Sequence, residues 1–479
     1  AFFYWRNAVI IMELFDSSSE DEAEEAMSTF SSSRKNKKTC FNSTFTFYGS
    51  IYARIKTFCK DKLERTAGEL PSELRDDLIL AHRILFVDNG CQTLTSPQVL
   101  SSLEKCEAIC NSCIRIGWNM LEENGTWPQP CYREMYIFSQ LMLSCCKIAH
   151  GKLKDAVQCA DFAFIVGAPK EETNLIFRLV DPEVRKLRLE LGQGQNESLL
   201  VKLNGISDRG NYIDIQKGVR NIAPLVHLIQ VDEVEAPSLE AFEKIFMSAK
   251  PCVLKNLISD WKAIEKWPHL HFFRNSYGHR QVPIEVYEGE NRELKEQTMS
   301  LKSFIDEFII PSCLVDQGKE IGKGKVAYLA QHSLFDQLPE LQSHFSPPKY
   351  IDANTDAEIV KCSIWFGTSD TITPLHYDSY NNFFMQIAGF KCVVLFPNDE
   401  TEKLYPIVDS KHSTAAQGNI SAVDVGNPDT LSYPLYEKAT GYKVLLKPGD
   451  TLFIPKGAWH YVQSLTPSLS INFFWNIKK

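Results

Sequence analysis

The C-terminal half of the chain reads as a series of short apolar strands separated by glycine and proline turns. Hydrophobic residues alternate with polar ones along these runs, which is the period of a strand with one buried face. Strands are expected at residues 252–255, 281–286, 359–366, 382–388, 391–396, 443–446, 451–454 and 468–475. Many short strands with such turns are typical of a double-sheet jelly roll, and we predict this architecture for the C-terminal part.

Two polar side chains in this half, His376 and Asp378, are two residues apart. In an extended strand such residues point to the same face, so both can bind one ion. His460 follows a Pro-Gly-Asp turn and a short strand, and a histidine on a neighbouring strand would complete a set of two histidines and one carboxylate. That set leaves coordination positions open, as non-haem Fe(II) oxygenases require. We therefore predict that His376, Asp378 and His460 bind the metal and form the catalytic centre.

Two other patterns in the chain look like metal sites at first reading. His269 and His271 are also two residues apart, but they lie among apolar residues at the start of an expected helix. We interpret them as packing or surface histidines. Cys106, Cys110 and Cys113 lie along one face of an expected helix, and no paired Cys-x-x-Cys follows them. A buried thiol face is therefore favoured over a zinc site.

The N-terminal half has the hydrophobic period of helices from residue 41 to residue 192. Residues 132–150 and 156–164 read as buried helices, and a shorter apolar stripe is formed by Leu78, Ile79, His82, Ile84 and Leu85. Several antiparallel helices joined by short loops predict an α-helical bundle or repeat-like array. No residues in it have catalytic spacing, so we interpret this part as a scaffold or docking domain.

The expected domain organisation has four parts: a disordered, acidic and serine-rich N-terminus (1–40), an α-helical domain (41–192), a linker (193–221) and a catalytic domain (222–479). A chain of 479 residues is long enough for two or three domains. Its formal net charge of −9 argues against a dominant nucleic-acid surface, and no apolar run is long enough to span a bilayer. The short basic run at 34–38 is a candidate nuclear import signal. The nucleus is thus the expected location, with the cytoplasm as a second one.

The catalytic half resembles the JmjC (jumonji-C) oxygenases, which have a cupin fold. The resemblance is carried by residues 328–341, by Trp365–Gly367 and by 453–461. It is strong from about residue 237 to the C-terminus and weaker through the helical half. It implies an α+β multidomain chain that ends in a double-stranded β-helix. It also implies Fe(II) as cofactor, with 2-oxoglutarate and O2 as cosubstrates.

The resemblance further implies which residues bind 2-oxoglutarate. The keto-acid end of this molecule chelates the metal, and its distal carboxylate must be anchored inside an apolar barrel by a cation and hydrogen-bond donors. The resemblance assigns the cation to Lys391 and the remaining contacts to Tyr328, Thr373 and Asn382. By itself, Lys391 at a turn between two strands would be interpreted as a surface lysine.

The same resemblance places Glu285 and Trp365 beside the substrate side chain. A carboxylate pairs bidentately with a guanidinium and an indole stacks on its plane, so this pair suits arginine. We therefore expect hydroxylation of an arginine in a protein or peptide substrate, with release of succinate and CO2. A chromatin-associated protein, a ribosomal protein or a histone tail are the expected substrates. Histone lysine demethylation and a metal-free adaptor acting through the helical domain stay open as alternatives.

Overall fold

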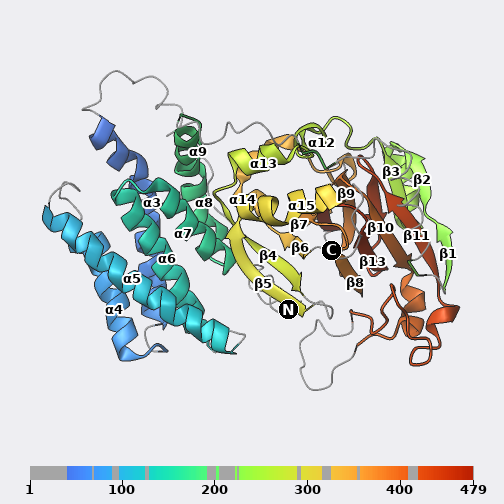
Figure 1. Cartoon of the computed structure of the whole chain (residues 1–479), viewed down its shortest axis with the longest axis horizontal. Helices are drawn as coiled ribbons and strands as arrows, with labels where there is room; N and C mark the ends of the chain where they lie inside the picture. Colours follow the sequence, from blue (N-terminus) through green and yellow to red (C-terminus); the bar gives the residue numbers. More distant parts are fainter. Residues whose placement is uncertain are drawn as a thin grey trace. The chain divides into compact units, whose positions relative to one another are not determined.

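The computed structural model describes residues 40–66, 69–88, 97–124, 129–190, 201–203, 219, 222–223, 226–288, 293–315, 325–352, 357–407 and 419–477. The chain divides into two compact units, Ala1–Gly192 with His279–Gln281, and Gln193–Gly278 with Val282–Lys479. Figure 1 colours the helices of the first unit blue to green and the sheets of the second yellow-green to red. The disorder predicted for residues 1–39 and nearly all of the predicted linker lie outside the described residues.

The first unit consists of helices, as the hydrophobic period predicts. The helices are α3 (Cys40–Thr66), α4 (Ser72–Arg83), α5 (Pro97–Asn124), α6 (Pro130–Ala149), α7 (Leu153–Ile165), α8 (Lys170–Leu179) and α9 (Asp181–Glu190), with a π-helical turn at Ile84–Asp88 after α4. Helix α6 contacts α3, α4, α5 and α7. Most of its side chains are buried, including small polar ones, because it is covered on several sides by its neighbours.

The cysteines of α5 form the buried thiol face that the sequence predicts. Cys106, Cys110 and Cys113 are all fully buried in the helical core. Cys106 donates a hydrogen bond to the carbonyl of Ala81 at 3.5 Å. The stripe predicted on α4 is correct at its buried positions but wrong at Ile79, whose side chain is 47% exposed. Adjacent residues of a helix point about 100° apart, so Ile79 cannot follow its neighbour into the core.

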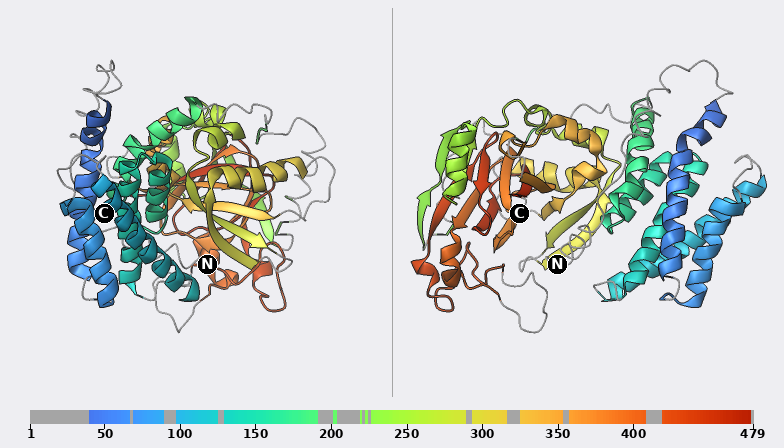
Figure 2. Two further views of the ribbon diagram at one scale, coloured as in Figure 1. Left: turned by 60° about the vertical axis from the view of Figure 1, so that its left-hand side comes forward. Right: turned by 180° about the vertical axis from the view of Figure 1, so that it is seen from behind.

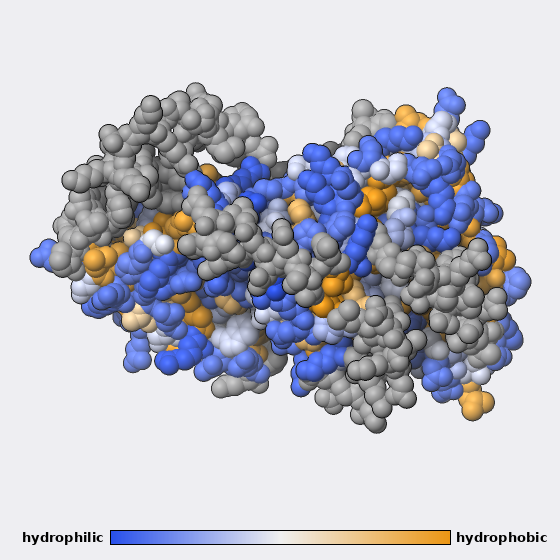
Figure 3. Space-filling model, turned by 45° about the horizontal axis from the view of Figure 1, so that its top comes forward, coloured by the Kyte–Doolittle hydropathy of each residue, from blue (hydrophilic) through white to orange (hydrophobic). Residues whose placement is uncertain are grey.

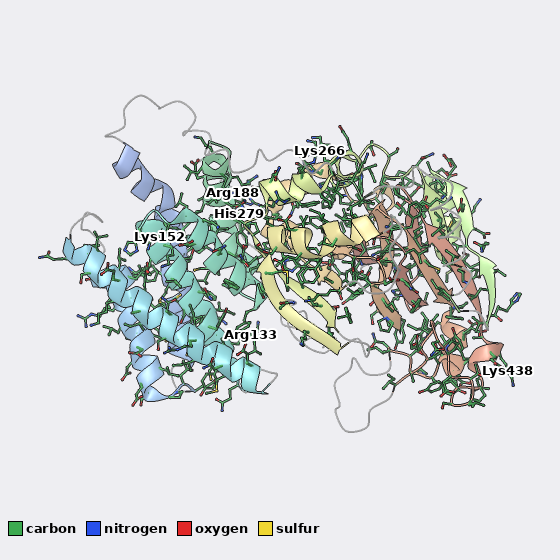
Figure 4. All side chains as sticks on the ribbon, in the orientation of Figure 1. Arg133, Lys152, Arg188, Lys266, His279 and Lys438 are labelled. Atoms are coloured by element: carbon green, nitrogen blue, oxygen red, sulfur yellow. The ribbon has the colours of Figure 1, made fainter. Side chains whose placement is uncertain are left out.

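The segment His279–Gln281 also belongs to this helical unit. A buried network of ion pairs holds it there. The Arg280 guanidinium is fully buried and donates to both oxygens of Asp161 at 3.1 Å. His279 bonds Asp181 at 2.5 Å through Nε2 and Arg188 at 2.8 Å through Nδ1 (Figure 4). Because arginine only donates, Nδ1 of His279 is the acceptor and Nε2–H donates to the carboxylate. Burial acts to raise the pKa of Asp181, but the Arg280 guanidinium and His279 outweigh it and lower this pKa to about 2.

Two β-sheets make up the second unit, in the strand orders β1-β11-β10-β13-β8 and β2-β3-β12-β9-β14-β7-β6-β4-β5 (Figure 1). Strands β1–β11 and β2–β3 are parallel, and the other registered pairs are antiparallel. The strands of the smaller sheet are β1 (His227–Gln230), β8 (Ile372–Tyr377), β10 (Lys391–Phe396), β11 (Thr440–Leu446) and β13 (Trp459–Ser464). Those of the larger sheet are β2 (Asp232–Glu235), β3 (Cys252–Lys255), β4 (Gln281–Glu288), β5 (Glu293–Ser300), β6 (Val326–His332), β7 (Ala357–Gly367), β9 (Asn381–Ala388), β12 (Thr451–Ile454) and β14 (Ser468–Ile477).

The two sheets pack face to face, which confirms the predicted jelly-roll architecture. One apolar cluster joins Val393 and Val444 of the smaller sheet to Phe384 and Leu452 of the larger one. Figure 2 shows the sheets from two further sides. All eight expected strands are present. Of the remaining described strands, β8 and β13 carry the predicted metal histidines, and β1, β2, β5 and β6 have no counterpart among the expected ones. The side chains of the edge strands β1 and β2 are largely exposed and carry no apolar alternation.

Short helices cover the outer face of the larger sheet. They are α11 (Leu239–Met247), α12 (Lys262–Lys266), α13 (Leu270–Ser276), α14 (Leu301–Phe304), α15 (Ile310–Val315), α16 (Leu334–Gln337) and α17 (Lys349–Asp352). Ser238 caps α11, because its hydroxyl accepts from the amide of Ala241 at 3.2 Å. A large apolar cluster under these helices contains Trp267 and Phe366. The central strands β9, β12 and β14 of the larger sheet are therefore buried on both faces.

Because most large apolar side chains are packed inside, polar side chains make up much of the surface. On the face drawn in Figure 3, hydrophilic residues predominate among the coloured side chains and hydrophobic ones are scattered. Among the described residues, no helix combines the length and the apolar character that crossing a membrane requires.

Candidate active site

His376 and His460 lie side by side on neighbouring strands of the smaller sheet. His376 on β8 is directly opposite His460 on β13 in the antiparallel ladder, and their ring centroids are 4.2 Å apart. Their chain neighbours Leu375 and Trp459 pack in the cluster on the outer face of this sheet. Because successive side chains of a strand alternate between faces, both imidazoles point to the inner face, between the sheets.

Asp378 completes the cluster from just beyond the end of β8. Its Oδ2 lies 3.9 Å from Nε2 of His376 and 3.6 Å from Nε2 of His460. The expectation that Asp378 shares a strand with His376 is wrong, because β8 ends at Tyr377. Instead, a hydrogen bond of 2.9 Å from the Gly457 amide to the Asp378 carbonyl fixes the turn that brings the carboxylate back.

Backbone carbonyls orient both imidazoles for a metal. Nδ1 of His376 bonds the carbonyl of Pro374 at 2.8 Å, and Nδ1 of His460 bonds that of Ala458 at 3.1 Å. A carbonyl only accepts, so each Nδ1 carries the proton and the lone pair of each Nε2 is left for a metal. Burial, helped by His376, lowers the pKa of His460 to about 4. His460 is therefore the neutral ligand that metal binding needs.

One potential ligand atom from each of these residues lies within 4.8 Å of the others, and within the described ranges this is the one such cluster of three or more. Two neutral nitrogens and one carboxylate oxygen on one side of a site fit Fe(II) with open positions opposite. The other histidine pair is not a metal site: His269 precedes α13, His271 is exposed, and their rings lie 5.5 Å apart at a tilt of 54°. Neither belongs to a cluster of potential ligands among the described residues.

A buried lysine marks the second part of the site. Lys391 opens β10 and is fully buried, with its Nζ 3.3 Å from the hydroxyl of Tyr328. It forms no ion pair with any carboxylate of the described residues, and burial lowers its pKa to about 7. Leu395, four residues further along β10, lies opposite His460. The lysine backbone is thus about 13 Å from the metal row along the strand.

The polar groups next to the Lys391 ammonium could also bind a ligand. Thr373 hydrogen-bonds Tyr328, whose phenol is buried and has a pKa raised well above its usual value. The amide oxygen of Asn382 is buried and has no hydrogen-bond partner among the described residues. A buried cation without an anion is costly unless a ligand supplies one. The distal carboxylate of a short dicarboxylic acid fits that requirement, so Lys391, Tyr328, Thr373 and Asn382 fit 2-oxoglutarate.

Glu285 and Trp365 lie on the same face of the larger sheet as Tyr328. Glu285 is directly opposite Tyr328, and Tyr328 is opposite Gly367, two residues after Trp365. The indole and phenol rings are 5.7 Å apart. Trp365 is held by a 3.0 Å hydrogen bond from its Nε1 to Oδ1 of Asn472. The structure therefore places Glu285 and Trp365 beside Tyr328, whose hydroxyl contacts Lys391.

Gly367 has a role that sequence reasoning does not assign. A Cβ at this position would lie 2.6 Å from Cδ2 of Tyr328 and 2.9 Å from the carbonyl oxygen of Ala327. Only glycine therefore lets the Tyr328 ring lie against β7. The one available sequence signal is the position of Gly367 at the end of the Trp365–Gly367 motif.

The fold and the donor set define a metal-dependent oxygenase of the cupin type, and comparison with known proteins agrees. Residues 238–479 match the family described as Cupin-like domain. JmjC domain-containing protein F of Dictyostelium discoideum is 32% identical over 430 residues, 78% of this chain and 88% of that protein. Lysine-specific demethylase 8 of Danio rerio is 30% identical over 443 residues, 88% of this chain and 100% of that protein.

A further relative, Jumonji C domain-containing protein 5 of Drosophila melanogaster, is 36% identical over 253 residues, 51% of this chain and 59% of that protein. The chain belongs to the JmjC-domain family, a family of 2-oxoglutarate oxygenases that includes lysine demethylases. Its members typically use Fe(II), which, held by His376, Asp378 and His460, would activate O2 for oxidation of a C–H bond.

Proposed function

We propose that this chain hydroxylates an arginine side chain of a protein or peptide substrate. The observation that carries the proposal is the environment of Glu285. Its carboxylate is half-buried beside Tyr328 and forms no ion pair with a lysine or arginine of the described residues. Burial raises the pKa of Glu285 to about 7, and a 2.9 Å hydrogen bond from the Tyr287 hydroxyl opposes that rise.

A substrate guanidinium would supply the missing cation. Its planar fork can engage both carboxylate oxygens, while the partly exposed indole of Trp365 covers one face. A trimethylated lysine has no N–H to donate to Glu285 and is recognised by an aromatic cage instead. The chemistry around Glu285 therefore favours arginine over methyl-lysine.

Lysine demethylation is the second candidate, because relatives of this chain carry the name lysine-specific demethylase. Oxidation of an N-methyl group would release formaldehyde, whereas oxidation of a side-chain methylene leaves a stable alcohol. The two reactions therefore give different products from the same site.

A competition assay separates the candidates. The full chain, with Fe(II), 2-oxoglutarate and ascorbate, is incubated with an equimolar mixture of an arginine peptide and its trimethyl-lysine counterpart. We expect a gain of one oxygen on the arginine peptide by mass spectrometry. Loss of methyl groups from the lysine peptide, with the arginine peptide unchanged, would replace the proposal by demethylation. A substrate in the nucleus stays a prediction, since residues 34–38 lie outside the described residues.

A further inference from the structure

Lys361 lies on the same face of β7 as Trp365 and is not used by the chemistry described above. Cys362, Ile364 and Phe366 belong to the apolar layer on the outer face of the larger sheet. By the alternation of a strand, Lys361 and Trp365 therefore point to the inner face, which carries the site. They are four positions apart in the sequence, so their backbones are roughly 13 Å apart along β7.

In the larger sheet, Lys361 is opposite Phe474 of β14, and Phe474 is opposite Asn382, one of the residues that fit 2-oxoglutarate. Burial lowers the pKa of Lys361 to about 8, and the carboxylates of Asp336 and, to a smaller extent, Asp378 act against this effect. Asp378 belongs to the metal site, and neither carboxylate is within ion-pair distance of Lys361 among the described residues. Within the described part of the chain, this half-buried lysine therefore has no ion-pair partner, although the metal ligand Asp378 influences it.

Among the described residues, Lys361 forms one hydrogen bond, and the residue that accepts it has an unusual backbone conformation. Nζ lies 3.3 Å from the carbonyl of Gln331, a long contact that leaves two of the three ammonium protons unused. Gln331 has a φ of 51°, in the left-handed region that non-glycine residues rarely adopt. The β6–β7 register shifts between Leu329 and His332, and this irregularity turns the Gln331 carbonyl toward β7.

A second donor without a partner lies on the same face. Ser363 is between Lys361 and Trp365 on β7 and is fully buried. Its hydroxyl has no hydrogen-bond partner among the described residues. The ammonium and this hydroxyl are both donors, so together they suit an acceptor that carries negative charge.

We propose that Lys361 binds the carboxylate of an aspartate or glutamate in the peptide substrate, close to the residue that is oxidised. This inference rests on the proposed function only in placing a peptide beside the metal. An extended peptide advances about 3.3 Å per residue, so a span of roughly 13 Å puts the acidic residue about three to four positions from the target. The site would then recognise two opposite charges of the substrate: the arginine cation through Glu285 and an acidic side chain through Lys361.

Binding of fluorescent peptides tests the proposal without turnover. Peptides carry one arginine and one glutamate placed two to five positions away on either side, and each has a counterpart with glutamine. For the preferred spacing, the wild-type chain should bind the glutamate peptide about five- to tenfold more tightly, as expected for a partly screened charged hydrogen bond. Lys361→Met should bring this ratio close to one, Lys361→Arg should restore it, and Lys361→Glu should reverse it.

The controls separate this contact from other roles of Lys361. Lys250→Met removes an exposed lysine that follows α11 and should leave the ratio unchanged. The proposal is overturned if Lys361→Met weakens both peptides equally, or if it weakens 2-oxoglutarate and leaves the peptide ratio intact. Mass spectrometry of the same peptides reports separately on arginine oxidation, so a failure of the proposed function does not affect the binding ratio.

Discussion

Replacing Lys391 by methionine should have opposite effects on the free chain and on cosubstrate binding. Burial lowers the pKa of Lys391 from 10.5 to about 7, which amounts to roughly 4–5 kcal/mol against a folded state with a charged lysine. Methionine fills much of the same volume without a charge. We therefore expect Lys391→Met to stabilise the chain without 2-oxoglutarate by roughly 1–4 kcal/mol, seen as a rise in Tm.

The pH dependence of this effect has a definite sign. Between about pH 7 and 10.5 the unfolded chain binds a proton at Lys391 that the folded chain lacks. Wild-type stability without cosubstrate should therefore increase with pH across this window, and the increase is lost as the pH falls back to about 7. The Lys391→Met variant should lack that contribution. A titration of Tm against pH for both proteins measures the difference.

Cosubstrate affinity should change in the other direction. In the variant, the distal carboxylate of 2-oxoglutarate would be buried without its cation, a loss of about 3–5 kcal/mol. At about 1.4 kcal/mol per factor of ten, the Kd rises roughly a hundredfold to several-thousandfold. Calorimetric titration of 2-oxoglutarate measures it, with Fe(II) titrated separately. Unchanged 2-oxoglutarate affinity, or lost iron binding with 2-oxoglutarate affinity intact, would refute this reasoning.

Three further substitutions test other parts of the site. His376→Ala should abolish 2-oxoglutarate turnover and Fe(II) binding, while its circular dichroism spectrum stays that of the folded protein. The control His271→Ala, at an exposed histidine, should be active. Activity in the His376→Ala variant would contradict the assignment of the metal ligands. Glu285→Gln should weaken arginine peptides about tenfold or more and remove the gain in their affinity as the pH rises through about 7, with peptide-free 2-oxoglutarate decarboxylation preserved; equal losses for arginine and lysine peptides would contradict the arginine pocket. Gly367→Ala should displace the Tyr328 ring, lower the free energy of unfolding by about 1–3 kcal/mol and raise the KM for 2-oxoglutarate. Unchanged stability and KM would mean that β7 shifts to make room for the Cβ, which would contradict the role given to Gly367.

The metal ligands were predictable because strand periodicity is a local property. His376 and His460 lie in segments whose alternation and turns define strands, and the inward direction of both side chains follows from that pattern. The position of Asp378 was not predictable to the same degree. It lies in a turn held by the Gly457 amide, which is 79 residues away in the chain, and no local pattern reports such a contact.

Burial of charged residues is the part that sequence does not reveal. Lys391 and Lys361 both sit in ordinary-looking strand segments, yet one is fully buried and the other faces the site. Resemblance to a family identified the first, and nothing in the sequence singled out the second. Arg280 is a similar case, because its buried partner Asp161 is 119 residues away. These environments depend on which elements meet in the fold, whereas propensity and periodicity describe one element at a time.

The most direct test of the central claim is the origin of the oxygen atom in the product. The chain is incubated with Fe(II), 2-oxoglutarate and an arginine peptide under isotopically labelled O2, and the peptide is fragmented by tandem mass spectrometry. We predict one labelled oxygen on the arginine side chain and succinate formed in equal amount, with both products lost in the His376→Ala variant. Succinate formation without a labelled arginine, together with formaldehyde when a methyl-lysine peptide replaces the arginine peptide, would contradict arginine hydroxylation.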